Sequence, residues 1–173
     1  MPNEPREKLK EAREHLSLVL GFFSRVDAKA SVVLAINTGM LAVIASNAPP
    51  LRQMSILSGI MAIVAVLTIS GSFWFLYRIA FPSLSGGQQS LLYFREIASR
   101  TEARFIDEFI EQDDQARLKD VLGQVWRNSE ILKQKFDALR VASILMAVAI
   151  VPWVAAVTLF SAQNAGARSL LVR

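Results

Sequence analysis

Three stretches of this sequence carry no charged residue over a length that could cross a lipid bilayer. They span residues 30–51, 53–77 and 141–167, and the last one becomes more polar after Phe160. A transmembrane helix needs roughly 20 predominantly apolar residues, so each stretch is long enough to supply one. The alternative is that all three are buried helices of a soluble protein, but a chain that is 53% apolar has too little polar surface to cover them. The sequence therefore predicts an all-α membrane protein with three transmembrane helices.

The distribution of basic residues predicts the orientation of these spans. Sixteen of the 19 Lys and Arg residues lie in segments 1–29 and 78–140, and the positive-inside rule places such segments in the cytoplasm. The N-terminus is then inside and the C-terminus outside. The predicted order is a cytoplasmic N-terminal helix (1–29), a transmembrane hairpin (30–77, with spans at about 30–48 and 54–77), a cytoplasmic helical region (78–140), a third transmembrane helix (141–162) and an external tail (163–173).

The composition excludes several classes of function. Cys is absent and His15 is the single His, which excludes disulfides, thiolate chemistry and zinc sites built from cysteines or several histidines. Segment 78–140 has ten basic and ten acidic residues, so it has no net charge with which to bind a nucleic acid backbone. The sequence has no Ser-His-Asp set, phosphate-binding glycine loop or metal-binding motif. We therefore expect neither an enzyme nor a nucleic-acid-binding protein, and no metal or cofactor.

Two long heptad patterns run from the cytoplasmic segments into the spans. The first occupies Leu9, Ala12, Leu16, Val19, Phe23, Val26, Ala30, Val33, Asn37, Met40 and Ile44. The second occupies Leu118, Leu122, Val125, Ser129, Leu132, Phe136, Leu139, Ser143, Met146, Ile150, Trp153, Val157 and Phe160. Apolar residues at alternating steps of three and four mark the contact face of a long helix. The patterns predict two continuous, parallel helices that contact each other through these faces.

Between the two long helices, the sequence predicts two shorter ones. Segments 85–88 and 99–102 each match a capping box, and Asp113 with Asp114 offers a further helix start. Apolar residues at helical spacing follow, in segments 91–97 and 105–110. We therefore expect a helical cytoplasmic bundle formed by the N-terminal arm, two short helices and the stem of the third span.

Small residues recur at four-residue steps within the first two spans. They form the sets Ser31, Ala35 and Gly39, Ser55 and Gly59, and Ser58 and Ala62. Small side chains let helices approach closely in lipid. Either packing within one subunit or contact between subunits would explain this spacing of small residues.

Two sets of polar residues stand at or inside the predicted membrane. Asp27 and Lys29 lie where the first helix enters the bilayer, and Lys135 and Arg140 lie at a comparable depth on the third-span helix, so we expect a membrane-boundary charge pair. Its simplest role is a salt bridge that fixes helix register. Asn37 lies on the first heptad pattern inside the span, where a lone amide seeks a partner on another helix. We expect an intramembrane polar clamp, and a pore-lining role is the alternative.

Four segments in order resemble a known family. They are DAKA at 27–30, Asn37 within SVVLAINTGMLAVIA, LLYFREIA at 91–98 and NSEILKQKFDALRVA at 128–142. In these segments the chain resembles the membrane-spanning effectors of the pyrimidine cyclase (Pycsar) anti-phage defence system, and the similarity extends from about Phe22 to Phe160.

The resemblance implies a protein of the bacterial inner membrane that works with a nucleotide cyclase. Such an effector is activated by a cyclic pyrimidine mononucleotide, cCMP or cUMP, and impairs the membrane, which causes growth arrest or abortive infection. A homo-oligomer whose spans rearrange would provide the leak. A related arrangement carries a phosphohydrolase domain, which this chain lacks.

A cyclic mononucleotide presents one phosphate charge and one flat base. Its site needs one or two cations, an amide or hydroxyl for the base edge and preferably an aromatic face. Arg95, Asn128 and Lys133 could supply the polar groups, with Tyr93 as the stacking or hydroxyl partner, if segment 91–98 packs on the third-span stem. The alternative for Arg95 and Lys133 is simple solvation of the bundle.

Two other functions stay open at this stage. A membrane scaffold could recruit a soluble partner through its helical stalk and use no ligand. A transporter is a weaker alternative, because the spans lack the intramembrane ionisable residues that ion coupling usually requires.

Overall fold

The computed structural model describes residues 4–81, 87 and 89–171, with side chains as far as Gly166. The helices are α1 (Glu4–Asn47), α2 (Ile56–Ala80), α3 (Phe94–Ala98), α4 (Glu102–Glu111) and α5 (Asp114–Leu171). Over these residues the chain forms no β-strand. The predicted all-α fold is therefore confirmed.

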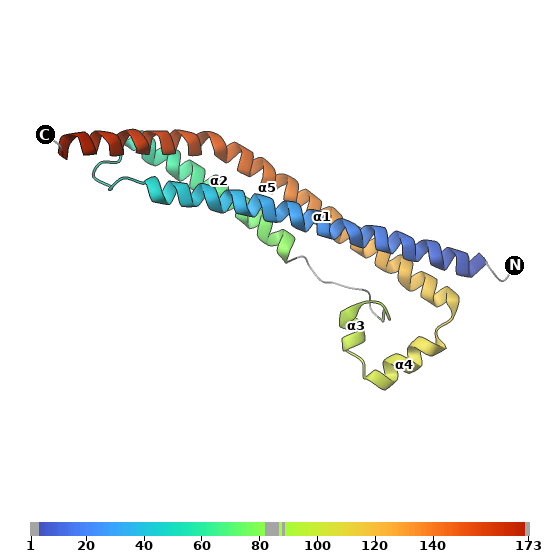
Figure 1. Ribbon diagram of the computed structural model, residues 1–173. Coiled ribbons are helices and arrows are strands. Elements are labelled where there is room, and N and C mark those ends of the chain that lie inside the picture. The colour runs from blue at the N-terminus through green and yellow to red at the C-terminus, as the bar shows by residue number, and fades with distance from the viewer. Residues whose placement is uncertain (1–3, 82–86, 88, 172–173) are drawn as a thin grey trace. The chain divides into compact units, whose positions relative to one another are not determined.

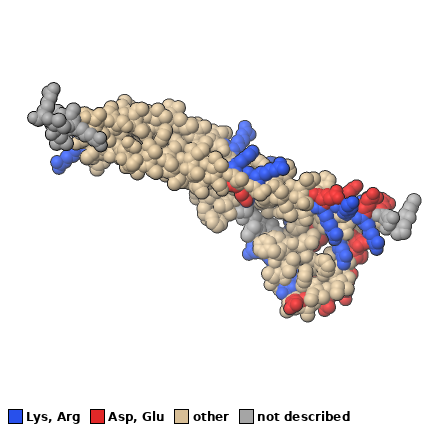
Figure 2. All heavy atoms as spheres, in the orientation of Figure 1, with Lys and Arg blue, Asp and Glu red and all other residues tan. Residues whose placement is uncertain are grey.

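The chain divides into two compact units. The charged unit comprises Met1–Val26 and Pro82–Phe136, and the membrane unit comprises Asp27–Phe81 and Asp137–Arg173. In Figure 2, Lys, Arg, Asp and Glu gather over the charged unit and at the ends of the charge-free stretches, and a broad tan surface without them remains. This division follows from the sequence, since residues 30–51, 53–77 and 141–167 hold no charge.

The membrane unit contains three helices that are long and apolar enough to cross a membrane. Segments of α1 and α5 lie beside α2 in this unit (Figure 1). Its interior is apolar and holds two clusters of buried residues, one formed by Met40, Ile69 and Ala149 and the other by Ile44, Ala65 and Phe160. The structure thus confirms three membrane-spanning helices.

The heptad pattern of α1 correctly identifies its contact face. All its positions from Leu9 to Ile44 are buried or half-buried in the structure. In the charged unit, Leu9 and Ala12 pack against Val121 of α5, with Leu16 and Leu118 beside them. The two long helices of this unit therefore meet through the apolar face that the sequence predicts for α1.

The heptad pattern predicted for α5 is displaced by one residue from the buried face at several positions, although Leu139 and Phe160, which belong to the pattern, are buried. Leu122 is 49% exposed and Ile150 is 45% exposed, whereas Val121 is 3% exposed and Ala149 is fully buried. Lipid solvates large apolar side chains, so small residues face the neighbouring helices in a bilayer. The buried positions of α5 accordingly include Ala138, Ala142, Ala149 and Ala156.

The short helices of the charged unit differ in part from the prediction. Thr101, and not Ser99, caps α4, and its hydroxyl accepts a hydrogen bond from the Arg104 backbone N–H; Ser99 instead ends α3. Asp113 caps α5 as expected, because its Oδ1 accepts from the Ala116 N–H at 2.6 Å. Three residues of the predicted capping box at 85–88 (85, 86 and 88) lie outside the described residues.

Arg100, which lies between α3 and α4, links the two helices, because its guanidinium donates to the Glu96 carbonyl of α3 at 2.6 Å and to Glu108 of α4. Glu108 accepts hydrogen bonds from the guanidinium groups of Arg100 and Arg104, each at 2.7 Å. Both hydrogen bonds lower the pKa of the Glu108 carboxyl below its ordinary value, and the bond from Arg104 has the larger effect. Glu108 therefore stays ionised, and the pairs stay formed, throughout the neutral range.

Candidate ligand-binding site

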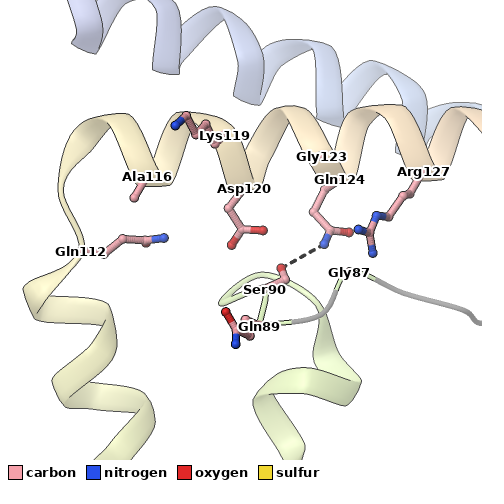
Figure 3. A pocket seen from close by; sticks show the side chains of 10 residues that line it. All are labelled: Gly87, Gln89, Ser90, Gln112, Ala116, Lys119, Asp120, Gly123, Gln124 and Arg127. Atoms are coloured by element: carbon pink, nitrogen blue, oxygen red, sulfur yellow. Dashed lines mark hydrogen bonds between the residues drawn. The ribbon is translucent and has the colours of Figure 1, made fainter.

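A pocket of about 300 Å³ opens in the charged unit between α5 and the segment that precedes α3. Figure 3 shows the side chains of Asp120, Gln124 and Arg127 directed from α5 toward this segment, with Gln112 entering from the end of α4. The pocket is lined by Gly87, Gln89, Ser90, Gln112, Ala116, Lys119, Asp120, Gly123, Gln124 and Arg127. It is polar, and its volume is at the lower end of the range for small-molecule sites.

The α5 side of the pocket follows from helix periodicity. Ala116, Asp120, Gln124 and Arg127 follow one another at steps of three or four residues, and this spacing places them, with Gly123, on one face of the helix. A Cβ at Gly123 would meet no atom within 4 Å. The pocket is therefore open beside this part of α5.

Two hydrogen bonds attach the opposite wall to α5. The Leu91 backbone N–H donates to Asp120 Oδ2 at 2.9 Å, and Gln124 Nε2 donates to Ser90 Oγ at 2.9 Å. Ser90 Oγ also accepts from the backbone N–H groups of Leu92 and Tyr93, both at 3.1 Å. Ser90 and Gln124 are buried, so water does not compete for the hydrogen bond between them. This bond therefore holds the wall against α5.

The pocket holds two cations and one carboxylate. Within the described part of the chain, the Arg127 guanidinium and the Lys119 ammonium form no hydrogen bond or ion pair. Gly87 lets Arg127 lie against the backbone, because a Cβ at this position would be 2.5 Å from Arg127 Nη1. A guanidinium with free N–H groups beside amides and a hydroxyl can bind an oxyanion through charge-assisted hydrogen bonds.

A smaller cavity of about 50 Å³ continues from this pocket and shares Gln112 and Asp120 with it. Its wall includes Phe109 and Arg117, and the Arg117 guanidinium lies 5.2 Å from the centroid of the Phe109 ring. An aromatic face and further cations therefore lie next to the polar pocket.

The four predicted ligand-binding residues lie outside the lining of the 300 Å³ pocket. Asn128 Nδ2 donates to the Gln124 carbonyl of its own helix at 2.8 Å. Tyr93 precedes α3, and the centroid of its ring lies 5.1 Å from that of the Phe94 ring in an edge-to-face arrangement. Arg95 and Lys133 are exposed. Their role in ligand binding stays a prediction.

The α5 wall of the pocket has a signal in the sequence, which the predictions above did not include. Polar residues at Asp120, Gln124 and Arg127 follow a four- and three-residue spacing just beside the apolar seam of α5. The opposite wall had no comparable signal, because Ser90 and Leu91 reach α5 through a side-chain hydroxyl and a backbone N–H that no motif marks.

At the predicted membrane boundary, Lys135 is buried. Its Nζ lies 5.4 Å from the centroid of the Phe23 ring, in the charged unit. Lys29 and Arg140 are exposed. The predicted pairing of Asp27 with Lys135 stays a prediction, which a double-mutant cycle with Asp27→Ala and Lys135→Ala can test.

Asn37 joins the three helices of the membrane unit. Its Nδ2 donates to Ser72 Oγ of α2 at 2.8 Å, and Ser72 Oγ donates to the Ala142 carbonyl of α5 at 2.8 Å. Asn37, Ser72 and Ala142 are fully buried. Asn37 Oδ1 accepts no hydrogen bond from the described residues. The amide thus links α1 to α2 and, through one hydroxyl, to α5.

The small residues of the first two spans occupy different surroundings. Ser58 is buried and Gly59 packs against Met54, where a Cβ would lie 3.5 Å from the sulfur. Ser31, Ala35 and Gly39 are exposed, and a Cβ on Gly39 would meet no atom within 4 Å. The small residues of α2 are therefore used in packing within the chain, and those of α1 are not.

Across the described residues, no group of three or more His, Cys, Asp or Glu side chains could hold a metal ion. No curated protein and no solved structure matches the chain. The model of one protein family, described as the Pycsar effector protein domain, matches residues 11–162, and this is not a known enzyme family. Since this match covers most of the 173 residues, the chain belongs to the family of Pycsar effector proteins, which act in anti-phage defence.

Proposed function

We propose that this protein is a membrane effector that a cyclic pyrimidine mononucleotide, cCMP or cUMP, activates to impair the bacterial inner membrane and arrest growth or abort infection. The observation that carries the proposal is a polar pocket whose cations form no ion pair with any described residue, in a chain whose other unit is a bundle of membrane-spanning helices. A nucleotide cyclase would supply the ligand as a functional partner.

The charge of the pocket suits such a ligand. Lys119 and Arg127 against Asp120 leave one net positive charge among the lining residues, and a cyclic phosphodiester carries one negative charge. The class of ligand is inferred from the family. The pocket supports it, because the Arg127 guanidinium can bind a phosphate there. The predicted set of Tyr93, Arg95, Asn128 and Lys133 is the competing location.

We infer that membrane damage requires several copies of the chain. The interior of the membrane unit is filled by apolar clusters, including Met40, Ile69 and Phe160, and offers no route for ions within one bundle. The small residues at 31, 35 and 39 leave an exposed face of α1 on which a second helix could pack closely. A homo-oligomer accounts for both observations.

Replacing Gly39 with leucine should weaken this association without disturbing the fold. The side chain has free space within its own chain, but it would keep a second helix at a distance. Cross-linking in membranes should show fewer oligomers, together with reduced toxicity. Ala147→Leu, at an exposed position of α5, is the matched control. Equal loss of oligomers in both variants would contradict a specific contact at Gly39.

The orientation stays as predicted from the 16 to 3 division of basic residues, with the N-terminus cytoplasmic and the C-terminus outside. Reporter fusions to both ends test it. A cytoplasmic report from the C-terminal fusion would contradict the three-span topology.

The proposed function is tested with purified protein in liposomes that contain a fluorescent dye. Addition of cCMP or cUMP should release the dye, whereas cAMP and buffer should not. A membrane scaffold without a ligand would bind neither nucleotide in calorimetry and would show no release, and that result would favour the scaffold over the effector.

A further inference from the structure

Asp120 is the one carboxylate among the residues described as lining the pocket. Its Oδ2 accepts the Leu91 backbone N–H at 2.9 Å. Its other oxygen, Oδ1, accepts no hydrogen bond from a described residue. In Figure 3 the carboxylate is directed into the pocket, between Gln112 at one end and Arg127 at the other. Asp120 therefore offers a free acceptor to whatever occupies the pocket.

The charges of the pocket determine which way a nucleotide lies in it. The phosphate is attracted by Arg127 and repelled by Asp120, which are both directed toward the segment that holds Ser90, whereas the Lys119 side chain lies on the other side of α5 (Figure 3). It therefore takes the end of the pocket that Arg127 forms, where the guanidinium lies against the backbone of Gly87. The base then lies toward Asp120 and Gln112, since these residues line the remaining part of the pocket.

An ionised carboxylate accepts hydrogen bonds and donates none. Where the carboxylate faces C4 of the base, cytosine presents an exocyclic amino group, which donates, whereas uracil presents a carbonyl oxygen, which a carboxylate repels. Adenine also carries an amino group that donates, so cAMP is the purine ligand against which the cytosine preference is compared.

We propose that Asp120 makes this pocket select a cytosine base over a uracil base, so that the activating ligand is cyclic CMP. This inference rests on the proposed function and names the ligand within the pyrimidine class. Asp120 acts as a specificity-determining residue, and Arg127 binds the phosphate that both nucleotides share.

The test is calorimetry of the full-length protein in nanodiscs with cCMP, cUMP and cAMP. Wild-type protein should bind cCMP at least about tenfold more tightly than cUMP, as expected for one good base-edge contact. In Asp120→Asn the amide oxygen still accepts from Leu91, and the amide N–H₂ can donate to the uracil oxygen. The preference should then fall to about threefold or less. Asp107→Asn, at an exposed carboxylate of α4 outside the pocket, should keep the wild-type preference.

The outcomes separate this inference from the proposed function. Failure of wild-type protein to bind any of the three nucleotides overturns both. Equal binding of cCMP and cUMP, or tighter binding of cAMP than of cCMP, overturns the base selection and leaves the effector proposal standing. A full cCMP preference in Asp120→Asn removes Asp120 from the role. The comparison of ligands on wild-type protein needs no variant, so it decides the base preference even if Asp120→Asn does not fold.

Discussion

Replacing Arg127 with alanine should lower the affinity for cCMP by about 10- to 150-fold, because a hydrogen bond to a charged group contributes about 1.5–3 kcal/mol. The guanidinium lines the pocket and forms no ion pair within the described chain, so its removal leaves no buried partner behind and the fold should survive. Calorimetry measures the affinity, and dye release from liposomes should require a correspondingly higher concentration of cCMP.

Three variants serve as comparisons for Arg127→Ala. Gly87→Ala keeps the charge but displaces the guanidinium, since the new Cβ would be 2.5 Å from Nη1; its affinity should lie between wild type and Arg127→Ala. Arg95→Ala and Asn128→Ala probe the competing set and should bind normally. If they lose affinity while Arg127→Ala does not, the ligand binds at the predicted set and not in the pocket.

Replacing Asn37 with aspartate should prevent stable assembly of the membrane unit. Asn37 is fully buried inside a span, and a charged aspartate at the centre of a membrane helix costs about 2.5–3.5 kcal/mol. An ionised carboxylate also cannot donate to Ser72 Oγ, the bond that Asn37 Nδ2 forms at 2.8 Å. Asn37→Asp should therefore give little protein in the membrane fraction and a lower unfolding temperature in detergent.

Asn37→Leu is the matched variant for this experiment. It removes one hydrogen bond, worth about 0.6–2 kcal/mol in a membrane, but buries no charge, so the protein should still insert and should be less destabilised than Asn37→Asp. Wild-type stability in Asn37→Asp would mean that water reaches this position, and the pore-lining interpretation of Asn37 would then gain support.

The sequence predicted the helices better than it predicted their faces. Charge-free length identified three spans because the bilayer imposes a minimum length on any helix that crosses it. The apolar face of α1 was correct, since Leu9, Val26 and Met40 are all buried. For α5 the same heptad rule predicted burial of Ile150 instead of Ala149. In a soluble protein an apolar residue is expected to be buried, but in a membrane it can face either lipid or another helix.

The pocket could be predicted only in part. Its α5 wall depends on local periodicity, which can be seen in the sequence at Asp120, Gln124 and Arg127. Its other wall depends on contacts between segments about 30 residues apart, such as Gln124 with Ser90. Arg95 and Lys133 were predicted from their charge together with the resemblance of their segments; both are exposed in the structure, and their role in ligand binding stays a prediction.

The one-residue error in α5 has a consequence for how this helix can move. Two sets of apolar residues lie next to each other on it: Val121 and Ala149 are buried, whereas Leu122 and Ile150 are exposed. Neighbouring residues on an α-helix are about 100° apart, so a rotation of that size about the helix axis would bring the second set to the contact face and move the first set off it. The pocket residues Asp120 and Arg127 belong to the same uninterrupted helix and turn with it. A ligand that bound one rotational state of this helix more tightly than another would shift the population toward that state.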